Sequence, residues 1–223
     1  MIKFDAVTQE YPDGTRALDG VSFAVAEGEF VFVVGPSGAG KTTLVKLLLR
    51  EESPTEGTLF FDDLEIPKLS DSEVAELRRQ IGVVFQEFKL IPSRTVLENI
   101  TLPLEVVGAE DAAERALEVL ELLGLSGRAN LFPHHLSGGE KERASFARAL
   151  VHKPRLLLAD EPTGNVDPET TAKILEVLTA VNEAGTTVIV ATHDDVMVDR
   201  LRQRVVRLEK GKIAKDEKKG KYR

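Results

Sequence analysis

The sequence predicts an α/β fold in which helices cover a parallel sheet. Three largely apolar segments have the length of buried strands: residues 30–34, which form a continuous apolar run, and residues 155–159 and 187–191. Stretches with a helical pattern separate the strands along the chain, as crossover helices do in parallel sheets: residues 43–50, 72–79 and 168–184. A glycine-rich loop directly follows the first of these strands. The 223 residues are therefore expected to form one α/β unit.

Patterns elsewhere in the chain extend this unit. Five more segments have the pattern of strands: residues 2–8, 17–25, 57–61, 81–85 and 204–208. Strand signals stop between residues 87 and 152, where the composition predicts helices at 111–123 and 140–151. We therefore expect four parts: core segments 1–86 and 153–209, a helical insertion 87–152 and a tail 210–223.

Charge separates an acidic body from a basic tail. The formal net charge of −8 argues against sequence-independent binding to nucleic acid, because such binding relies on a cationic surface. The tail, residues 210–223, carries seven Lys and Arg residues against Asp216 and Glu217. Two interpretations of the tail stay open: a frayed, solvated end, or an electrostatic contact with anionic lipid or with a partner loop near the membrane.

Two absences narrow the class of protein further. The chain has no cysteine, which excludes a disulfide scaffold, a thiolate metal site and a cysteine nucleophile. No apolar run approaches the roughly 18 residues that span a bilayer, and residues 1–5 lack the apolar core of a signal peptide. We therefore expect a soluble protein of the cytosol, which reaches a membrane only through a partner or its own surface.

The glycine-rich loop has the pattern G-x-x-x-x-G-K-[ST] of a phosphate-binding P-loop. Its glycines allow backbone N–H groups to turn toward a phosphate, and the helix that follows adds its positive end. Lys41 would reach the β- and γ-phosphates, and Thr42 would offer its hydroxyl to Mg²⁺. The residues assigned to ATP binding are Gly35, Pro36, Ser37, Gly38, Ala39, Gly40, Lys41, Thr42 and Thr43.

Polar side chains at the ends of neighbouring strands are candidates for the hydrolytic chemistry. Because parallel strands deliver ligand groups at their carboxyl ends, these side chains should lie beside the P-loop. Asp160 suits Mg²⁺, and Glu161 is placed to polarise the attacking water as a general base. Gln86 follows the strand 81–85 and would touch both Mg²⁺ and the water. His193 would hydrogen-bond the γ-phosphate and orient the water.

A second glycine-rich segment, Leu136-Ser137-Gly138-Gly139-Glu140, opens the predicted helix 140–151. A helix N-terminus carries unsatisfied N–H groups, so this segment also suits an anion. Two phosphate-contacting loops in one small chain indicate an ATPase whose site closes only between two subunits. Because each chain carries one loop of each kind, a symmetric homodimer would complete both sites.

Together these motifs resemble the nucleotide-binding domain of ABC ATPases, and residues 136–140 match the signature of that family. The resemblance covers essentially the whole chain. It implies a RecA-like P-loop core with an N-terminal antiparallel β-subdomain and an inserted α-helical subdomain, with ATP and Mg²⁺ as cofactors. It further implies that Tyr11 stacks on adenine and that His193 is the switch histidine. Asp167 belongs to the implied D-loop, Gly164-Asn165-Val166-Asp167, and the signature would contact the γ-phosphate bound by the opposite subunit.

Within the family, the chain resembles the cell-division branch, in which the ATPase pairs with an integral membrane protein resembling FtsX. Six runs carry this resemblance: residues 30–41, 47–52, 85–90, 94–100, 102–104 and 130–134. It implies a peripheral ATPase on the cytoplasmic side of the inner membrane that regulates cell-wall hydrolases. The segment after Gln86 would line the groove for the partner's coupling helix. Its apolar members fit an ordinary core equally well: Phe88, Leu90, Ile91 and Val96.

Two other functions share parts of this pattern. An exporter or lipoprotein-release ATPase of the same family would use the same chemistry. A soluble ABC ATPase that works on DNA or ribosomes is disfavoured by the acidic charge and by the lack of coiled-coil insertions or a second cassette. The chain departs from the family at Lys141 and Glu142, where glutamines are usual, which leaves open whether position 141 contacts the ribose across the dimer.

Overall fold

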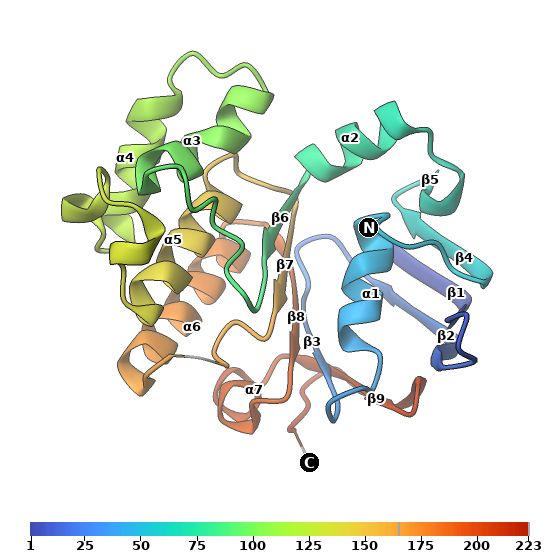
Figure 1. The fold of residues 1–223 in the computed structure, drawn as a ribbon. Helices are drawn as coiled ribbons and strands as arrows, with labels where there is room; N and C mark the ends of the chain where they lie inside the picture. Colours follow the sequence, from blue (N-terminus) through green and yellow to red (C-terminus); the bar gives the residue numbers. More distant parts are fainter. Residues whose placement is uncertain (165, 223) are drawn as a thin grey trace.

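The computed structural model describes residues 1–164 and 166–222, and its strands form two sheets (Figure 1). The smaller sheet is antiparallel and has the order β2-β1-β4-β5. Its strands are β1 Ile2–Glu10, β2 Arg16–Val25, β4 Glu56–Phe61 and β5 Leu64–Glu65. The larger sheet has the order β10-β9-β3-β8-β7-β6. Its strands are β3 Phe30–Val34, β6 Ile81–Val84, β7 Leu156–Asp160, β8 Thr187–Thr192, β9 Arg204–Glu209 and β10 Lys212–Glu217.

The larger sheet is parallel except for its β10 edge, and its centre is covered on both faces. In β3 alternate side chains enter separate cores, with Phe30, Phe32 and Val34 on one face and Val31 and Val33 on the other. A strand covered on both faces needs an apolar side chain at every position, which explains the continuous run at 30–34. The predicted α/β fold, with its antiparallel β-subdomain, is confirmed.

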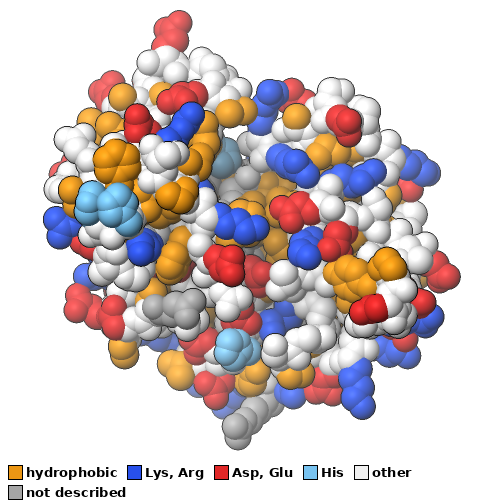
Figure 2. Space-filling model, in the orientation of Figure 1, with side chains coloured by type: hydrophobic (Ala, Val, Ile, Leu, Met, Phe, Trp, Pro, Cys, Tyr) orange, Lys and Arg blue, Asp and Glu red, His pale blue; other side chains and the backbone are white. Residues whose placement is uncertain are grey.

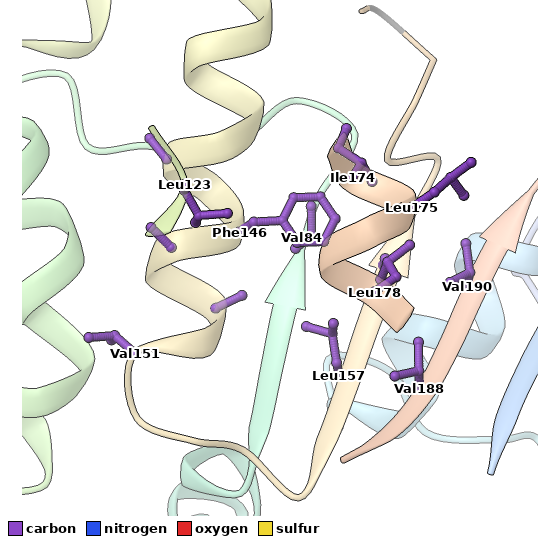
Figure 3. Packing of buried hydrophobic residues seen from close by; sticks show 14 of the residues in the cluster. Val84, Leu123, Phe146, Val151, Leu157, Ile174, Leu175, Leu178, Val188 and Val190 are labelled. Carbon is purple, nitrogen blue, oxygen red and sulfur yellow. The ribbon is translucent and has the colours of Figure 1, made fainter. Parts of the chain in front are cut away.

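Helices pack against both faces of the larger sheet. They are α1 Lys41–Leu48, α2 Asp71–Arg79, α3 Val96–Val106, α4 Ala112–Leu122, α5 Gly138–Leu150, α6 Pro168–Glu183 and α7 Asp195–Leu201. On one face α1 lies between the two sheets and buries Leu44 and Leu47 (Figure 1). On the other face Phe146 of α5 points toward Val84 of β6, beside Ile174 of α6 (Figure 3). Among the described residues, none of these helices is long and apolar enough to cross a membrane.

The helical insertion consists of α3, α4 and α5, which lie between β6 and β7 along the chain and pack against one another. A capping box opens α3, from Thr95 to Glu98, and another opens α5. The composition predicts α4 and α5 but not α3, because Pro103 removes an N–H from the helical ladder. Packing against α4 and α5 keeps α3 helical through that proline. The boundaries of the insertion at residues 87 and 152 stay a prediction.

The basic tail is not frayed, so the first interpretation of it is wrong. Residues 212–217 form β10, which pairs with β9, and Arg204 bridges to Asp216 at 2.7 Å. The Tyr222 N–H donates to Asp199 Oδ1 at 2.9 Å, and the Tyr222 ring packs against the core. Pairing along a sheet edge is a long-range interaction that composition alone does not reveal. Arg223 lies outside the described residues.

Candidate active site

The P-loop joins β3 to α1 and holds the Lys41 side chain inside the protein. Lys41 is 6% exposed, and its Nζ donates to the carbonyl oxygens of Gly35 at 2.8 Å and Pro36 at 3.3 Å. Gly40, directly before the helix, has a φ of 105°, and a Cβ there would lie 2.4 Å from the Ala17 carbonyl oxygen. Both the backbone conformation and this close approach therefore require glycine. The result is a buried ammonium at a helix N-terminus, where an anion is stabilised.

Glu161 directly follows β7 and faces Lys41. Its Oε1 lies 3.3 Å from Lys41 Nζ, and its Oε2 lies 2.8 Å from His193 Nδ1. The same Oε2 accepts hydrogen bonds from the His193 N–H at 3.1 Å and the Thr192 hydroxyl at 3.2 Å. With a φ of 51°, Glu161 is in the left-handed region, which costs roughly 1–2 kcal/mol for a residue with a Cβ. The structure thus brings Lys41, Glu161 and His193 together at one edge of the sheet.

The neighbouring carboxylate, Asp160, fits a divalent cation. Its side chain is 6% exposed, and its Oδ1 is buried without a hydrogen-bond partner in the described structure. Burial raises the pKa of Asp160, and the Thr42 side chain and the Lys41 charge oppose that shift. A bound cation would supply a partner for the free oxygen and restore the ionised form. Residues 1–164 and 166–222 contain no cluster of three His, Cys, Asp or Glu side chains suited to a metal.

Half of the predicted site residues line one cavity of about 400 Å³. It is lined by Tyr11, Ser37, Gly38, Gly40, Lys41, Thr42, Thr43, Gln86, Glu161 and His193. Tyr11 is fixed in place because its hydroxyl donates to Glu52 Oε2 at 2.9 Å and lies 3.3 Å from Thr43 Oγ1. The cavity is also lined by Thr15, Arg16 and Ala17, which were not predicted from the sequence. These residues belong to no recognisable motif, and only their position close to Tyr11 in the sequence could have indicated them. Among the assigned loop residues, Gly35, Pro36 and Ala39 form the loop without lining the cavity.

The signature segment lies away from this cavity. Ser137 and Gly138 are exposed at the start of α5, Leu136 is buried, and none of the described residues 136–140 lines the cavity. The Ser137 hydroxyl accepts from the Glu140 N–H, and Glu140 Oε2 accepts from the Ser137 N–H at 2.8 Å. Arg128 donates to Glu140 Oε1 at 2.6 Å and thereby lowers the pKa of Glu140 to about 2. The helix N-terminus is firmly capped yet open to solvent.

Asp167 is a helix cap in this structure. Its Oδ1 accepts from the N–H groups of Glu169 at 3.0 Å and Thr170 at 2.9 Å at the start of α6. Thr170 also packs against the signature helix, since a Cβ added to Gly139 would lie 2.6 Å from Thr170 Oγ1. Asp167 therefore caps α6, and α6 in turn packs against the start of the signature helix through Thr170. Asn165, in the D-loop, lies outside the described residues.

A second cavity, of about 510 Å³, lies between α2, β6 and the helical insertion, and we call it the groove. Its apolar lining includes Ile81, Val83, Phe85, Leu102, Pro103, Val106 and Val107. Four lining side chains are cationic, and none of the described lining residues is acidic: the cations are Arg78, Arg79, Lys89 and Arg148. Figure 2 shows hydrophobic side chains in this hollow with Lys and Arg side chains around it. The structure favours core packing for Val96 and Leu90, and neither Phe88 nor Ile91 lines the groove.

A P-loop lysine that faces a glutamate and a histidine at the carboxyl ends of parallel strands defines a P-loop ATPase. The chain belongs to the ABC transporter family, which it matches over residues 18–164. It is 49% identical to the cell division ATP-binding protein FtsE of Mycobacterium tuberculosis, over all of this chain and 98% of that one. The FtsE of Bacillus subtilis is 46% identical over the same shares, and that of Escherichia coli is 43% identical over 96% of this chain and 97% of its own. The predicted cell-division branch is confirmed.

Solved structures of ABC cassettes share the fold. The dimeric structure of the bacterial ABC transporter cassette MJ0796 is 40% identical and has a TM-score of 0.91, with 99% of each chain covered. The post-hydrolysis dimer of MJ0796 bound to ADP and Pi is 39% identical, with the same TM-score and coverage. A third neighbour, cbiO1 from Clostridium perfringens, is 29% identical with a TM-score of 0.85, over 97% of this chain and 88% of its own. The predicted ATPase class is confirmed, and ATP is its nucleotide.

Proposed function

We propose that this chain is the ATP-binding and hydrolysing subunit of an FtsE–FtsX-type membrane complex in bacterial cell division. The observation that carries the proposal is a joint one. One half of an ATP site, built around Lys41, Glu161 and His193, is assembled, while the signature helix is exposed, in a chain 43–49% identical to FtsE proteins. In this proposal ATP draws two subunits together, hydrolysis releases them, and the complex passes the cycle to cell-wall hydrolases.

Each side chain in the Lys41 cavity then has a defined task. Tyr11 stacks on adenine, and the P-loop with Lys41 binds the phosphates. The donor set of Thr42, Gln86 and Asp160 holds Mg²⁺, which neutralises negative charge on the phosphates when it is bound. Glu161 accepts a proton from the attacking water, and its contact with His193 keeps the carboxylate directed toward the cavity. His193 is exposed, so it can turn to the γ-phosphate without breaking core packing.

The signature serves the site of the opposite subunit in this proposal. Ser137, Gly138 and Gly139 would contact the γ-phosphate across a homodimer, because the exposed start of α5 offers N–H groups and a hydroxyl to an anion. Asp167, which accepts a hydrogen bond from the Thr170 hydroxyl beside that helix, would lie at the same interface. The dimeric form of the MJ0796 cassette, which has the same fold, supports this arrangement.

The groove is the surface that we assign to the membrane partner. Its apolar walls suit one face of a short helix. None of the described lining residues is acidic, although Arg79 pairs with Glu76 beside the groove, so the cations suit a segment that carries carboxylates. We therefore propose an acidic amphipathic cytoplasmic segment of an FtsX-like protein as the occupant. This places the chain as a peripheral protein on the cytoplasmic side of the inner membrane. An ATPase subunit of a lipoprotein-release or macrolide-type exporter is the alternative, and it would differ in the partner that fills the groove.

Reconstitution with the FtsX-like protein of the same organism tests this function. The chain should co-purify with that protein in detergent or nanodiscs, and the Arg79→Glu variant should lose it while keeping its own ATP binding. Arg200→Glu, an exposed charge on α7, is the matched control. An ATPase rate that depends on an added solute, with no capture of the FtsX-like protein, would support the exporter instead and overturn the proposal.

A further inference from the structure

The loop after Gln86 has an unusual backbone. Phe88 and Lys89 are consecutive residues with φ values of 59° and 46°, in the left-handed region. Residues with a Cβ adopt this region at a cost, so two in succession need support from outside the loop. Within the loop, the Phe88 N–H donates to the Phe85 carbonyl at 2.9 Å, which forms the turn directly around Gln86.

The support comes from Arg148, on α5. Its Nη2 donates to the Phe88 carbonyl at 2.8 Å, and its Nη1 donates to the Lys89 carbonyl at 2.5 Å. The hydroxyl of Ser145, one turn earlier on α5, also donates to the Phe88 carbonyl, at 3.3 Å. A guanidinium presents two N–H groups in a fixed fork, so a single side chain holds both strained residues.

Arg148 has no other charged partner to explain its position. In the part of the chain that the structure describes, no carboxylate lies within ion-pair distance of its guanidinium, and burial lowers its pKa. A half-buried cation whose hydrogen bonds all go to backbone carbonyls is costly unless those bonds have a structural purpose. Here the purpose is the shape of the loop, because both carbonyls belong to its two strained residues.

The loop also lies beside the proposed metal site. The Lys89 ammonium is 4.0 Å from the centre of the Phe85 ring, and its charge acts on Asp160. Gln86 lines the Lys41 cavity, while Lys89 and Arg148 line the groove. We call the bonds from Arg148 to the carbonyls of Phe88 and Lys89 the Arg148 clamp. This clamp joins three parts of the molecule: the cavity, the groove and the helix that begins at the signature.

We propose that Arg148 is a positioning residue for ATP hydrolysis. It holds residues 86–89 in their strained conformation, which fixes the Gln86 amide at the metal side of the cavity and fastens the loop to the signature helix. A partner segment bound in the groove would change the position of Gln86 by altering the hydrogen bonds of Arg148. This inference rests on the proposed role of Gln86 as a ligand of Mg²⁺ and water.

Steady-state kinetics of Arg148→Ala provides the first test. Because a displacement of about 1 Å in a positioning group lowers turnover by up to about 100-fold, we expect kcat to fall roughly 10- to 100-fold. The Mg²⁺ concentration for half-maximal rate should rise, while KM for ATP stays within about twofold. Arg115→Ala is the matched control, since the Arg115 Nη2 also donates to a backbone carbonyl near α5, that of Val151 at 3.0 Å, away from Gln86. It should leave kcat and the Mg²⁺ dependence unchanged.

A second variant separates loop geometry from loss of stability. Glycine adopts positive φ without the Cβ penalty, so Phe88→Gly in the Arg148→Ala background should restore kcat by about fivefold. Arg148→Lys should not restore it, because an ammonium cannot present the two-pronged fork. A merely structural role for Arg148 would predict no rescue by Phe88→Gly, and that outcome would overturn the inference.

Gln86→Ala, measured beside these variants, distinguishes a failure of the Arg148 clamp from a failure of the proposed role of Gln86. If Gln86→Ala lowers kcat and raises the Mg²⁺ requirement but Arg148→Ala does neither, the clamp is wrong and the proposed ATP site stands. If Gln86→Ala itself leaves both quantities unchanged, the proposed role of Gln86 is wrong, and the inference falls with it. If both variants lower kcat and raise the Mg²⁺ requirement, the clamp and the proposed role of Gln86 are both supported.

Discussion

The two glycine-rich segments, residues 35–42 and 136–140, both lead into a helix N-terminus, yet their surroundings are opposite. The first encloses a lysine that is 6% exposed and that lies against Glu161 in a cavity. The second exposes Ser137 and Gly138 to solvent and lines no part of that cavity among the described residues. The chemistry of a helix N-terminus is the same in both places.

The difference shows that a motif does not by itself define a site. In the proposed site, the P-loop has its catalytic partners at the ends of adjacent strands, so most of that site lies within one chain. Among the described residues, the signature is held in shape by its capping groups, Glu140 and Arg128, and by Thr170 packed on Gly139, and none of these is a candidate catalytic group. An anion-binding helix that is prepared but open fits a surface that a second subunit completes. The predictions below test this contrast.

The largest effect is expected at the P-loop lysine. Lys41→Ala should lower ATP affinity by at least about 100-fold, because charge-assisted bonds to the phosphates are lost in a buried site. Equilibrium binding of a fluorescent ATP analogue measures this. Lys68→Ala, an exposed lysine that pairs with Glu65 and lines no part of the cavity, should bind normally. Retained affinity in Lys41→Ala would mean that the buried lysine does not define the ATP site.

The second largest effect is expected at Glu161, where a substitution should separate ATP binding from ATP hydrolysis. Glu161→Gln should keep ATP binding, lose about 10²–10⁴ in turnover and accumulate as an ATP-bound dimer, since the general base is removed. Light scattering after gel filtration with and without ATP and Mg²⁺ reports the dimer. Glu183→Gln, an exposed position late in α6, is the control. A Glu161→Gln variant that stays monomeric at saturating ATP would contradict the shared-site arrangement.

A mixing experiment tests the contrast between the two segments directly. Lys41→Ala and Ser137→Arg should each be inactive alone, because each breaks both sites of a homodimer. Mixed in equal amounts, they should recover activity up to about a quarter of the wild type, since half of the dimers then hold one intact site. If the signature served the Lys41 cavity of its own chain, the mixture would stay inactive.

The smallest effect on turnover is expected for a substitution of Glu142, in the signature helix. Its effect on stability should be clear. Glu142 is 2% exposed, its Oε1 has no hydrogen-bond partner among residues 1–164 and 166–222, and burial raises its pKa to about 8. The folded state therefore favours the protonated form, and stability from this group is complete below the unfolded pKa near 4.5 and is lost as the pH rises toward 8. Between pH 4.5 and 7 the loss amounts to about 3 kcal/mol.

Glu142→Gln should remove this dependence, because the amide stays neutral at every pH. Chemical denaturation at several pH values should show the variant gaining stability over the wild type as the pH rises, with little change in ATP affinity. Glu183→Gln again serves as the control. Equal changes with pH in Glu142→Gln and the wild type would show that residue 142 does not titrate in the folded protein.

Local sequence patterns revealed the sheet core and the chemistry at its edge. Apolar runs such as 30–34 are dictated by burial on both faces, and the P-loop spacing is dictated by the turn around a phosphate. Patterns did not reveal α3, because Pro103 argues against a helix locally while packing maintains it. They also missed β10, the lining residue Arg16 and the Arg148 clamp, since each of these depends on segments that meet only after folding.

The sequence by itself determined the class of fold, the phosphate-binding loop and the candidate catalytic groups, because each depends on short-range patterns of apolar residues, glycine, lysine and carboxylates. Only the tertiary structure decided which of these groups meet. It placed Glu161 against Lys41 and His193, left Ser137 in solvent, and tied the loop after Gln86 to the signature helix. The physical reason is that distances between strand ends, and the contacts that hold a strained loop, are set by packing of segments far apart in the chain.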